Sequence, residues 1–293
     1  MTGVLVLGSQ GMLGSMLVKV LGANPALDLA QTARRPGNRG GLAFDATNDS
    51  VEDLLEAGDW QWVINAIGLT KQHIDEDDPR SVEAAFEVNA RFPQRLADAA
   101  RAQRRIVSIS TDGVFSGADG PYDEGASPDA SDVYARSKRE GELSGPGVVQ
   151  LRCSVVGPEP NGSGSLLEWA LSQPRGARIN GYTDQRWNGL TTWHFAKLCE
   201  GMIRGPVGEL PAPLHVIPRD AVSKAELLRL MLGAYGRDDV EVVPAQSGDA
   251  ADRTLTTRHR DANRLLWAEA GWTEPPGVET MVSELAAVAP RNG

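Results

Sequence analysis

Short runs of apolar residues alternate with stretches of helical periodicity through the first half of the chain. Residues 4–7 form a continuous apolar run, and the apolar positions between residues 12 and 21 fall on one helical face. Further strands are predicted at 27–32, 42–44, 62–67, 105–110 and 148–156, and a helical region at 81–103 carries Pro93 either as a kink or as the first turn of a new helix. This alternation implies right-handed crossovers and a doubly wound parallel sheet with helices on both faces.

The pattern changes after residue 156. Residues 157–165 are rich in Pro, Gly and Ser, and beyond them the alternation is irregular, with helices predicted at 166–171 and 224–232 and strands at 214–217 and 240–243. A chain of 293 residues can form one large or two modest domains. We therefore expect an α/β protein in which residues 1–156 form the doubly wound domain. Residues 157–293 are expected to form a smaller α/β domain that closes over it, with some segments packing back on the first.

The net charge and the cysteine content argue against several classes of function and structure. With 29 Lys and Arg against 39 Asp and Glu, the net charge is −10, which argues against nucleic acid or an anionic membrane as the main partner. Cys153 and Cys199 are far apart and the histidines are scattered singly, so we expect neither a disulfide scaffold nor a metal site. No basic segment precedes the first apolar run, and no stretch approaches the roughly 18 apolar residues of a membrane span, so we expect a cytoplasmic protein.

A glycine-rich loop lies between the first predicted strand and the first predicted helix. Glycines at these positions let the chain turn tightly and approach a pyrophosphate, while the helix N-terminus offers unpaired N–H groups to the anion. The alternative is a purely structural turn, but the strand–loop–helix context favours a Rossmann-like dinucleotide site. The residues expected to bind the cofactor here are Gly8, Ser9, Gln10, Gly11, Met12, Leu13 and Gly14.

The end of the second predicted strand indicates which dinucleotide is used. An acidic residue there would bind the ribose 2′-hydroxyl of NAD, whereas this chain has Arg34 and Arg35 and no carboxylate. A guanidinium can pair with a 2′-phosphate, so NADPH is the preferred cofactor, with NADH and a plain basic turn as alternatives. Asp45, followed by Ala46, is the candidate for the adenine edge.

Three residues form a candidate catalytic set. The fifth predicted strand delivers Ser110 and Thr111 to the carboxyl edge of the sheet, and Tyr134 and Lys138 follow four residues apart on one helical face. A phenol of reference pKa ~10 needs a nearby cation to act near neutral pH, and Lys138 supplies one. A YxxxK pair alone is common on solvated helices, but beside a glycine loop and a Ser-Thr strand end it indicates catalysis by Thr111, Tyr134 and Lys138.

These residues resemble the extended short-chain dehydrogenase/reductase superfamily, and within it the dTDP-4-dehydrorhamnose reductase family of nucleotide-sugar reductases. The resemblance covers nearly the whole chain. Beyond the motifs above, it rests on Asn65-Ala66-Ile67-Gly68, Asn89, Ser110-Thr111-Asp112 with Val114-Phe115, Gly141-Glu142, Leu151-Arg152-Cys153-Ser154, and Asp184-Gln185 followed by Gly189 and Thr191. The last segment carries two extra residues and has Leu190 where the family has proline.

The resemblance implies NADPH-dependent reduction of the 4-keto group of a nucleoside-diphosphate 4-keto-6-deoxy sugar, with Tyr134 protonating the alkoxide that Thr111 stabilises. It adds cofactor contacts at Ala66, Ile67, Gly68, Asn89, Ser110, Tyr134 and Lys138. The implied substrate contacts are Lys71, Thr111, Asp112, Val114, Phe115, Tyr134, Gln185, Trp187 and Asn188.

One position separates this chain from related activities. Related nucleotide-sugar dehydratases carry a carboxylate pair after the strand end, whereas here Gly113 follows Asp112, so reduction is favoured over dehydration. The reductases usually have an aromatic residue there. The nucleotide is therefore left open among dTDP, UDP and GDP, and Trp187 is as well explained by packing between domains.

Two other functions remain as alternatives. One is a non-catalytic cofactor-binding regulatory subunit, and the other is a nucleotide-sugar epimerase with tightly bound NAD. A homodimer is also open, since no exposed apolar stripe in the sequence can be assigned to an interface.

Overall fold

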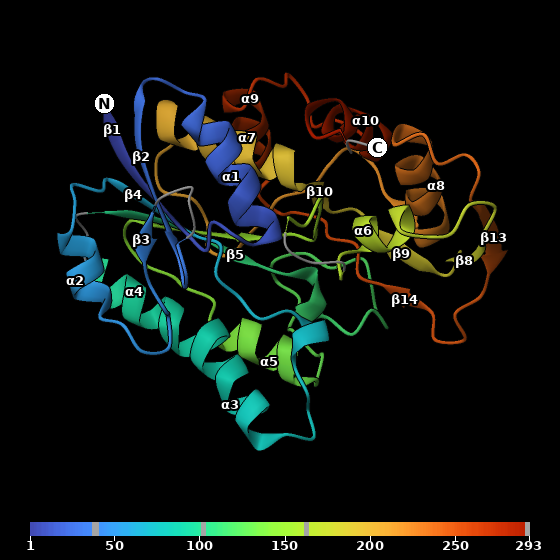
Figure 1. Ribbon diagram of the computed structural model, residues 1–293, viewed down its shortest axis with the longest axis horizontal. Coiled ribbons are helices and arrows are strands. Elements are labelled where there is room, and N and C mark those ends of the chain that lie inside the picture. Colours follow the sequence, from blue (N-terminus) through green and yellow to red (C-terminus); the bar gives the residue numbers. More distant parts are fainter. Residues whose placement is uncertain (37–40, 101–103, 161–163, 291–293) are drawn as a thin grey trace.

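A seven-stranded parallel sheet, with six strands from the first half of the chain and one from the second, forms the centre of the fold (Figure 1). The computed structural model describes residues 1–36, 41–100, 104–160 and 164–290. The strand order is β11-β6-β5-β4-β1-β2-β3. The strands are β1 (Thr2–Leu7), β2 (Leu27–Ala33), β3 (Leu42–Ala43), β4 (Trp62–Asn65), β5 (Arg105–Ser110), β6 (Val148–Arg152) and β11 (Leu214–His215). The predicted doubly wound α/β fold is confirmed.

Helices cover both faces of this sheet, as Figure 1 shows. On one face, Val4 and Val6 of β1 pack in the same apolar cluster as α1 (Met12–Gly22) and α7 (Thr192–Arg204). Leu5 and Leu7 point to the other face, in a cluster with α2 (Val51–Glu56) and α4 (Phe92–Ala100). Because β1 is buried on both sides, its apolar run is continuous rather than alternating.

The helical region predicted around Pro93 is divided by a wider turn. Helix α3 (Pro79–Phe86) continues through a π-helical segment η2 (Glu87–Arg91) into α4, where Pro93 is the second residue. Proline has no N–H to donate to the preceding turn, so a change of helical register just before it is physically expected. Residues 101–103, where the prediction ended, and 161–163 of the predicted linker lie outside the described residues.

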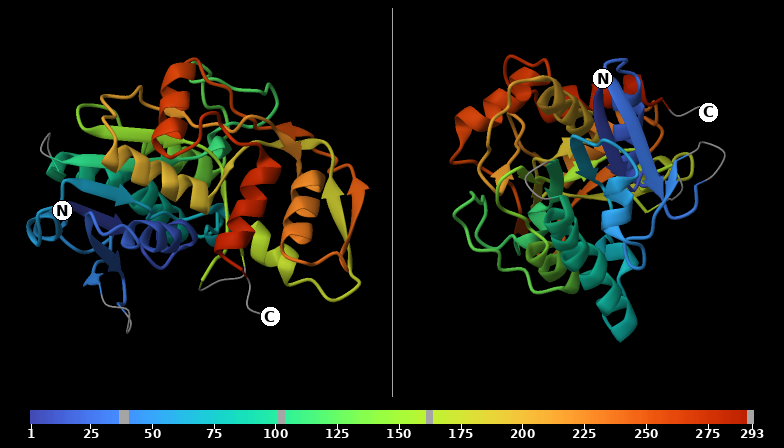
Figure 2. Two further views of the ribbon diagram at one scale, coloured as in Figure 1. Left: turned by 90° about the horizontal axis from the view of Figure 1, so that it is seen from above. Right: turned by 90° about the vertical axis from the view of Figure 1, so that its left-hand side faces the viewer.

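Three small sheets complete the fold. The sheet that contains β10 lies near the middle of the molecule in Figure 1, and the other two lie with α6 and α8 at the end opposite β2, β3 and α2 (Figures 1 and 2). The strands of the three sheets are β7 (Val155–Val156) with β10 (Leu190–Thr191), β8 (Arg178–Tyr182) with β13 (Glu241–Ala245), and β9 (Gln185–Trp187) between β12 (Val222–Ser223) and β14 (Ala251–Asp252). The remaining helices are α5 (Val133–Glu140), α6 (Leu166–Leu171), α8 (Lys224–Ala234), α9 (Arg260–Glu269) and α10 (Val278–Val288).

Three features after residue 147 differ from the sequence prediction. Helices α7, α9 and α10 were not predicted, although Lys197, Glu200 and Arg204 of α7 recur at helical spacing and the helix packs against α1 and α9. The strand predicted at 148–156 is two strands, because the chain leaves β6 after Arg152 and resumes as β7 beside β10. Strand β11 joins β6 in the large sheet. Within the described residues, no helix is long and apolar enough to cross a membrane.

Candidate active site

The glycine loop after β1 closes tightly around the start of α1. Gly8 has φ +80°, a conformation that favours glycine, and a Cβ on Gly14 would lie 2.1 Å from the Gly8 carbonyl oxygen. Gly11 is the N-cap of α1 and supplies no side-chain cap, so the first N–H groups of this 11-residue helix are left for another acceptor. The loop therefore fits a pyrophosphate at the helix N-terminus.

The end of β2 carries two exposed guanidinium groups. Arg34 and Arg35 follow Ala33, and within the described residues neither side chain makes a hydrogen bond or a close ion pair. Gln10 of the glycine loop donates to the Arg35 carbonyl oxygen at 3.0 Å, which brings the loop and the arginine pair together. Hydrogen bonds from Thr47 lower the pKa of Asp45, and the positive charge of Arg34 acts in the same direction.

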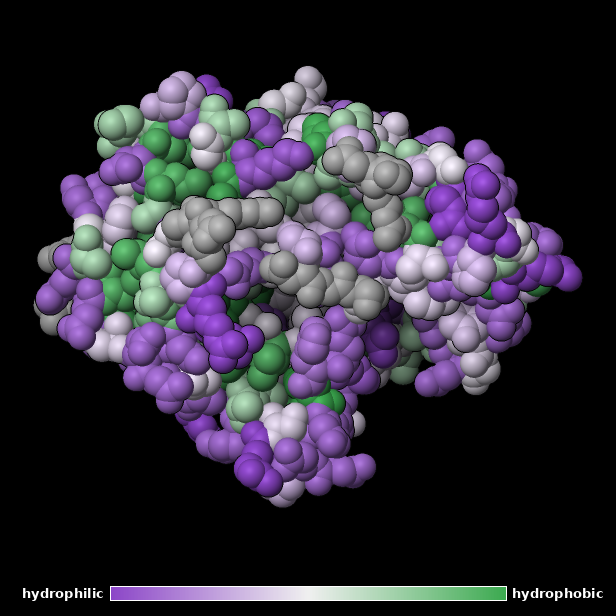
Figure 3. All heavy atoms as spheres, in the orientation of Figure 1, coloured by the Kyte–Doolittle hydropathy of each residue, from purple (hydrophilic) through white to green (hydrophobic). Residues whose placement is uncertain are grey.

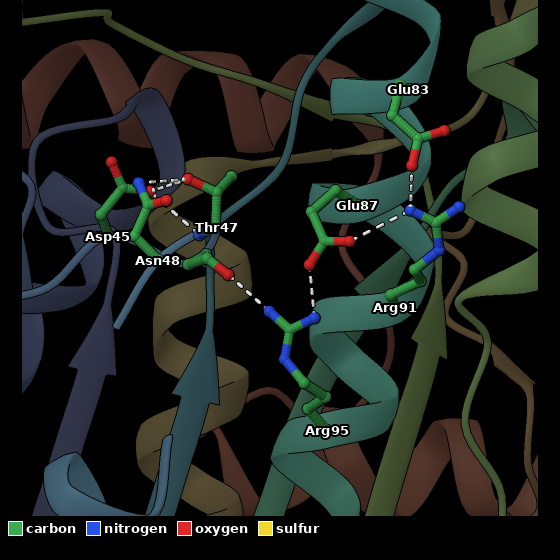
Figure 4. Close-up of polar contacts among 8 residues, drawn as sticks. Asp45, Thr47, Asn48, Glu83, Glu87, Arg91 and Arg95 are labelled. Carbon is green, nitrogen blue, oxygen red and sulfur yellow. Dashed lines mark hydrogen bonds and ion pairs between the residues drawn. The ribbon is translucent and has the colours of Figure 1, made fainter. Parts of the chain in front are cut away.

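The loop that starts at Asp45 is bonded to helix α4 (Figure 4). Asp45 Oδ1 accepts from the Thr47 N–H at 3.0 Å and from its hydroxyl at 2.6 Å. Arg95 donates to the Ala46 carbonyl oxygen at 2.6 Å and also pairs with Glu87. Arg95 is a positioning residue for the predicted adenine loop, and nothing in the sequence pattern indicated it.

The segment after β4 is fixed by two asparagines. The N–H of Ile67 donates to Asn65 Oδ1 at 3.0 Å, directly after the strand. Asn89 binds both backbone groups of Leu69, accepting its N–H at 2.8 Å and donating to its carbonyl at 2.9 Å, and donates to Ser137 Oγ at 3.1 Å. With its amide used in this way, Asn89 connects the π-helical turn, this segment and the helix that carries Tyr134.

The predicted catalytic residues converge at the carboxyl end of β5. Thr111 follows β5, and a Cβ placed on Gly113 would lie 3.2 Å from both Thr111 Oγ1 and Tyr134 Cε1, so the hydroxyl and the phenol ring are neighbours. Lys138 Nζ donates to the Ile109 carbonyl oxygen at 2.8 Å. All three side chains remain partly exposed, and Figure 3 shows a recess near the middle of the molecular face on which the start of α1 lies.

Burial sets the protonation of these groups. It raises the pKa of Tyr134 to about 12, against the opposing effect of the Thr111 hydroxyl, so the phenol is protonated at neutral pH. It lowers the pKa of Lys138 to about 8, with the negative charge of Glu142 acting in the opposite direction. The pair therefore presents a proton donor beside a cation, which suits protonation of an alkoxide.

A buried polar network lies behind this pair. Glu142 accepts from Ser110 Oγ at 2.6 Å and from Arg152 at 2.9 and 2.6 Å. Arg152 lies opposite His215 in the register of β6 and β11 and also contacts its Nε2 at 2.9 Å. Because His215 Nδ1 lies 2.9 Å from the Thr256 carbonyl, which can only accept, Nδ1 carries the proton and Nε2 accepts from Arg152.

The other predicted substrate contacts are mostly engaged elsewhere. Val114, Phe115 and Trp187 are buried, and Trp187 donates to Ser154 Oγ at 2.9 Å. Asn188 binds both backbone groups of Leu255, at 2.7 and 2.9 Å. Lys71 pairs at 2.9 Å with Asp132, the N-cap of α5. Thr111, Asp112, Tyr134 and Gln185 are the predicted substrate residues that keep partly exposed side chains, and the Thr111 hydroxyl donates to Asp112 Oδ1 at 3.2 Å.

Two charged residues near Asp112 were missed by the sequence reasoning. The charges of Lys224 and Arg253 both act on Asp112. Lys224 is the first residue of α8 and Arg253 follows β14, so both lie more than a hundred residues from Asp112 in the chain. No motif or spacing marks them, because their position depends on the pairing of strands two or three residues long. No cluster of three metal-ligating side chains occurs among residues 1–36, 41–100, 104–160 and 164–290.

Comparisons with known proteins agree with this geometry. The sequence model of a family described as "RmlD substrate binding domain" matches residues 1–263. A probable low-salt glycan biosynthesis reductase of Haloferax volcanii is 32% identical, covering 97% of this chain and 96% of that protein. The methionine adenosyltransferase 2 subunit beta of Danio rerio is 29% identical, covering 82% and 76%. The fold matches dTDP-4-dehydrorhamnose reductase of Bacillus anthracis in complex with NADP, with a TM-score of 0.77, 21% identity and coverage of 99% and 100%.

Proposed function

The chain belongs to the RmlD substrate binding domain family, and from this premise we propose that it reduces the 4-keto group of a nucleoside-diphosphate 4-keto-6-deoxy sugar with NADPH. The chain is an NAD(P)H-dependent oxidoreductase of this family. The observation that supports the reaction is that Thr111, Tyr134 and Lys138 converge at the carboxyl edge of the sheet, the edge at which the glycine loop also lies.

The residues present fit the dinucleotide. The uncapped start of α1 and the close Gly8–Gly14 turn suit the pyrophosphate, and the guanidinium groups of Arg34 and Arg35 suit the 2′-phosphate. When bound, NADPH supplies the hydride that reduces the carbonyl. A 2′-phosphate carries charge that the unpaired arginines can match, so we expect NADPH to be preferred over NADH.

The protein's own residues orient the carbonyl and deliver a proton. The Thr111 hydroxyl, held by the Gly113 N–H at 3.0 Å, is placed to hydrogen-bond the substrate oxygen. The protonated Tyr134 phenol donates its proton to that oxygen as negative charge develops, and the ammonium of Lys138 stabilises the phenolate that remains. A carboxylate at position 113, as a dehydration mechanism would need, is absent.

The two halves of the chain divide this work in our proposal. Residues 1–156 bind the cofactor and carry the catalytic groups, and residues 157–293 bind most of the nucleotide sugar. In support, the small sheet of β9, β12 and β14 approaches the end of β5 through Arg253, whose Nε donates to the Phe115 carbonyl at 2.8 Å.

The test is turnover with a panel of ketosugars. Wild-type protein should oxidise NADPH when offered a dTDP-, UDP- or GDP-linked 4-keto-6-deoxyhexose, and Tyr134→Phe should reduce kcat by about 10² to 10⁴, as expected when a general acid is removed. NADPH affinity of this variant should stay near that of wild type. Tyr182→Phe is the matched control, because Tyr182 is an exposed residue of β8. No NADPH oxidation with the whole panel would refute the proposal.

A regulatory subunit is the second candidate, favoured by the similarity to methionine adenosyltransferase 2 subunit beta. A binding role alone does not require Thr111, Tyr134 and Lys138 together, so their convergence favours the enzyme. Co-purification with another enzyme whose kinetics change on binding, without ketosugar turnover, would support the subunit instead.

A further inference from the structure

The turn between β9 and β10, residues 188–189, lies against the carboxyl edge of the central sheet. Strands β5 and β6 are parallel neighbours that end side by side, at Ser110 and Arg152. Thr111 follows β5 directly, and Ser154 follows β6 by two residues, so both lie at this edge. A segment that is fixed to Ser154 is therefore fixed next to the place where the reaction is proposed to occur.

Three contacts fix the turn to Ser154. Trp187 Nε1 donates to Ser154 Oγ at 2.9 Å, and the Leu190 N–H donates to the Ser154 carbonyl oxygen at 2.8 Å. A Cβ placed on Gly189 would lie 2.5 Å from that carbonyl oxygen and 2.6 Å from Trp187 Cζ2, so the turn passes too close to Ser154 for any side chain at this position. Because Trp187 is only 2% exposed, its indole is enclosed and its N–H is held in one direction.

A second connection joins the same turn to the segment that begins at Thr111. Asn188 binds both backbone groups of Leu255, at 2.7 and 2.9 Å. Leu255 forms a parallel bridge with Tyr122, whose ring stacks on Phe115 with the centroids 4.2 Å apart. The turn is therefore connected to the catalytic half both directly and through Leu255. Burial of an indole ring alone would not require these polar contacts.

We propose that Trp187 is a positioning residue, whose bond to Ser154 sets where the substrate-binding half lies relative to the Tyr134 phenol. This inference rests on the proposed function. The same segment carries Gln185, the partly exposed residue of β9 that is predicted to contact the sugar. Reacting atoms must be aligned about 3 to 3.5 Å apart, and a displacement of about 1 Å can lower a rate about 10²-fold. Loss of the indole N–H should therefore reduce kcat more than it changes the binding of either ligand.

Trp187→Phe removes the indole N–H and keeps an aromatic ring in its place. With saturating NADPH and the preferred ketosugar, we expect kcat to fall about tenfold, while KM for the sugar and the dissociation constant of NADPH change less than about twofold. Ser154→Ala should give a similar loss, because it removes the acceptor of the same bond. The double variant should be no slower than either single variant, since only one interaction is lost.

Trp267→Phe is the matched control. Trp267, on α9, is also fully buried, and its Nε1 donates to the Ile217 carbonyl oxygen at 3.0 Å. The two variants remove the same atoms, so a general effect of the smaller ring would appear in both, whereas only Trp187→Phe should lower kcat. Equal losses in the two variants, wild-type kcat in Trp187→Phe, or losses that add in the double variant with Ser154→Ala would each overturn the inference.

Hydrogen exchange examines the same contact without turnover. The Leu190 N–H donates to Ser154, so its exchange rate reports whether the turn stays on Ser154. We expect the peptide that contains Leu190 to exchange severalfold faster in Trp187→Phe, as loss of one hydrogen bond implies, and at the wild-type rate in Trp267→Phe. Unchanged exchange in Trp187→Phe would overturn the inference. If exchange rises as expected but wild-type protein reduces no ketosugar, the Trp187 contact stands and the proposed reaction fails.

Discussion

Glu142 should control the pH range in which the enzyme works. In the proposed mechanism Lys138 must be charged to stabilise the Tyr134 phenolate, yet burial lowers the pKa of Lys138 to about 8, while the negative charge of Glu142 acts to raise it. Glu142→Gln keeps the shape of the side chain and its bond to Ser110 but removes the negative charge. It also leaves the buried Arg152 cation without its carboxylate, which disfavours the charged form of Lys138 further.

The size of the effect follows from the titration of Lys138. A lysine of pKa about 8 is half charged at that pH and loses its charge as the pH rises. Removing an opposite charge nearby typically shifts a pKa by 1 to 3 units. Because Glu142 is also paired with Arg152, we expect the pKa of Lys138 to fall by an amount near the lower end of this range, about 1 unit. At about pH 8 the charged fraction then falls from about one half to about one tenth, roughly a fivefold loss, whereas at about pH 6 almost nothing is lost.

The assay is the pH dependence of kcat/KM, which reports ionisations of the free enzyme. We expect the high-pH limb of Glu142→Gln to move to lower pH by about one unit, with the low-pH plateau kept. Glu140→Gln, an exposed change at the end of the same helix, should leave the limb in place. A Glu142→Gln profile with the wild-type midpoint and a uniformly lower plateau would show that Glu142 is only structural, and the reasoning would be wrong.

Two further predictions concern folding and cofactor choice. Gly141→Ala should lower the free energy of unfolding by roughly 1 to 3 kcal/mol in urea titrations, because its Cβ would lie 1.8 Å from the Asn89 carbonyl oxygen. Gly208→Ala, with no atom within 4 Å, is the control, and equal stability of both variants would contradict the packing argument. Arg34→Gln combined with Arg35→Gln should weaken NADPH binding about tenfold or more and leave NADH binding nearly unchanged, as measured by fluorescence titration. An equal loss for both cofactors would refute a 2′-phosphate contact.

The central sheet could be predicted because each of its main strands carries its own signal. The fifth strand was predicted at residues 105–110, the bounds that β5 has, since β5 is a largely apolar run in a sheet covered on both faces. Strand β11 has two residues and joins β6 only through tertiary structure, so its place in the sheet could not be read from local pattern. Helix α7 was missed although its sequence carries a helical signal, since the polar residues Lys197, Glu200 and Arg204 recur at i, i+3 and i+7.

The residues of the candidate site also differ in whether a local sequence pattern or a long-range contact determines their position. Thr111, Tyr134 and Lys138 could be predicted as candidates because a strand end and a four-residue helical spacing fix where side chains point. The Glu142–Arg152–His215 network and the Lys224–Arg253 pair depend on contacts between distant segments, and single charged residues have no period to mark them. Phe115 and Trp187 were predicted as substrate contacts, but the structure buries both aromatic rings.

The net charge of −10 is compatible with the proposed phosphorylated cofactor if the cations that bind it are placed locally. Arg34 and Arg35, the residues proposed to bind the 2′-phosphate, lie exposed at the end of β2. At physiological ionic strength the screening length is about 8 Å, so a phosphate bound there is governed by the charges next to it rather than by the distant acidic surface. Because an exposed ion pair is weakened by salt, added salt should weaken the binding of NADPH more than that of NADH, which lacks the 2′-phosphate. Equal salt dependence for the two cofactors would contradict a 2′-phosphate contact at Arg34 and Arg35.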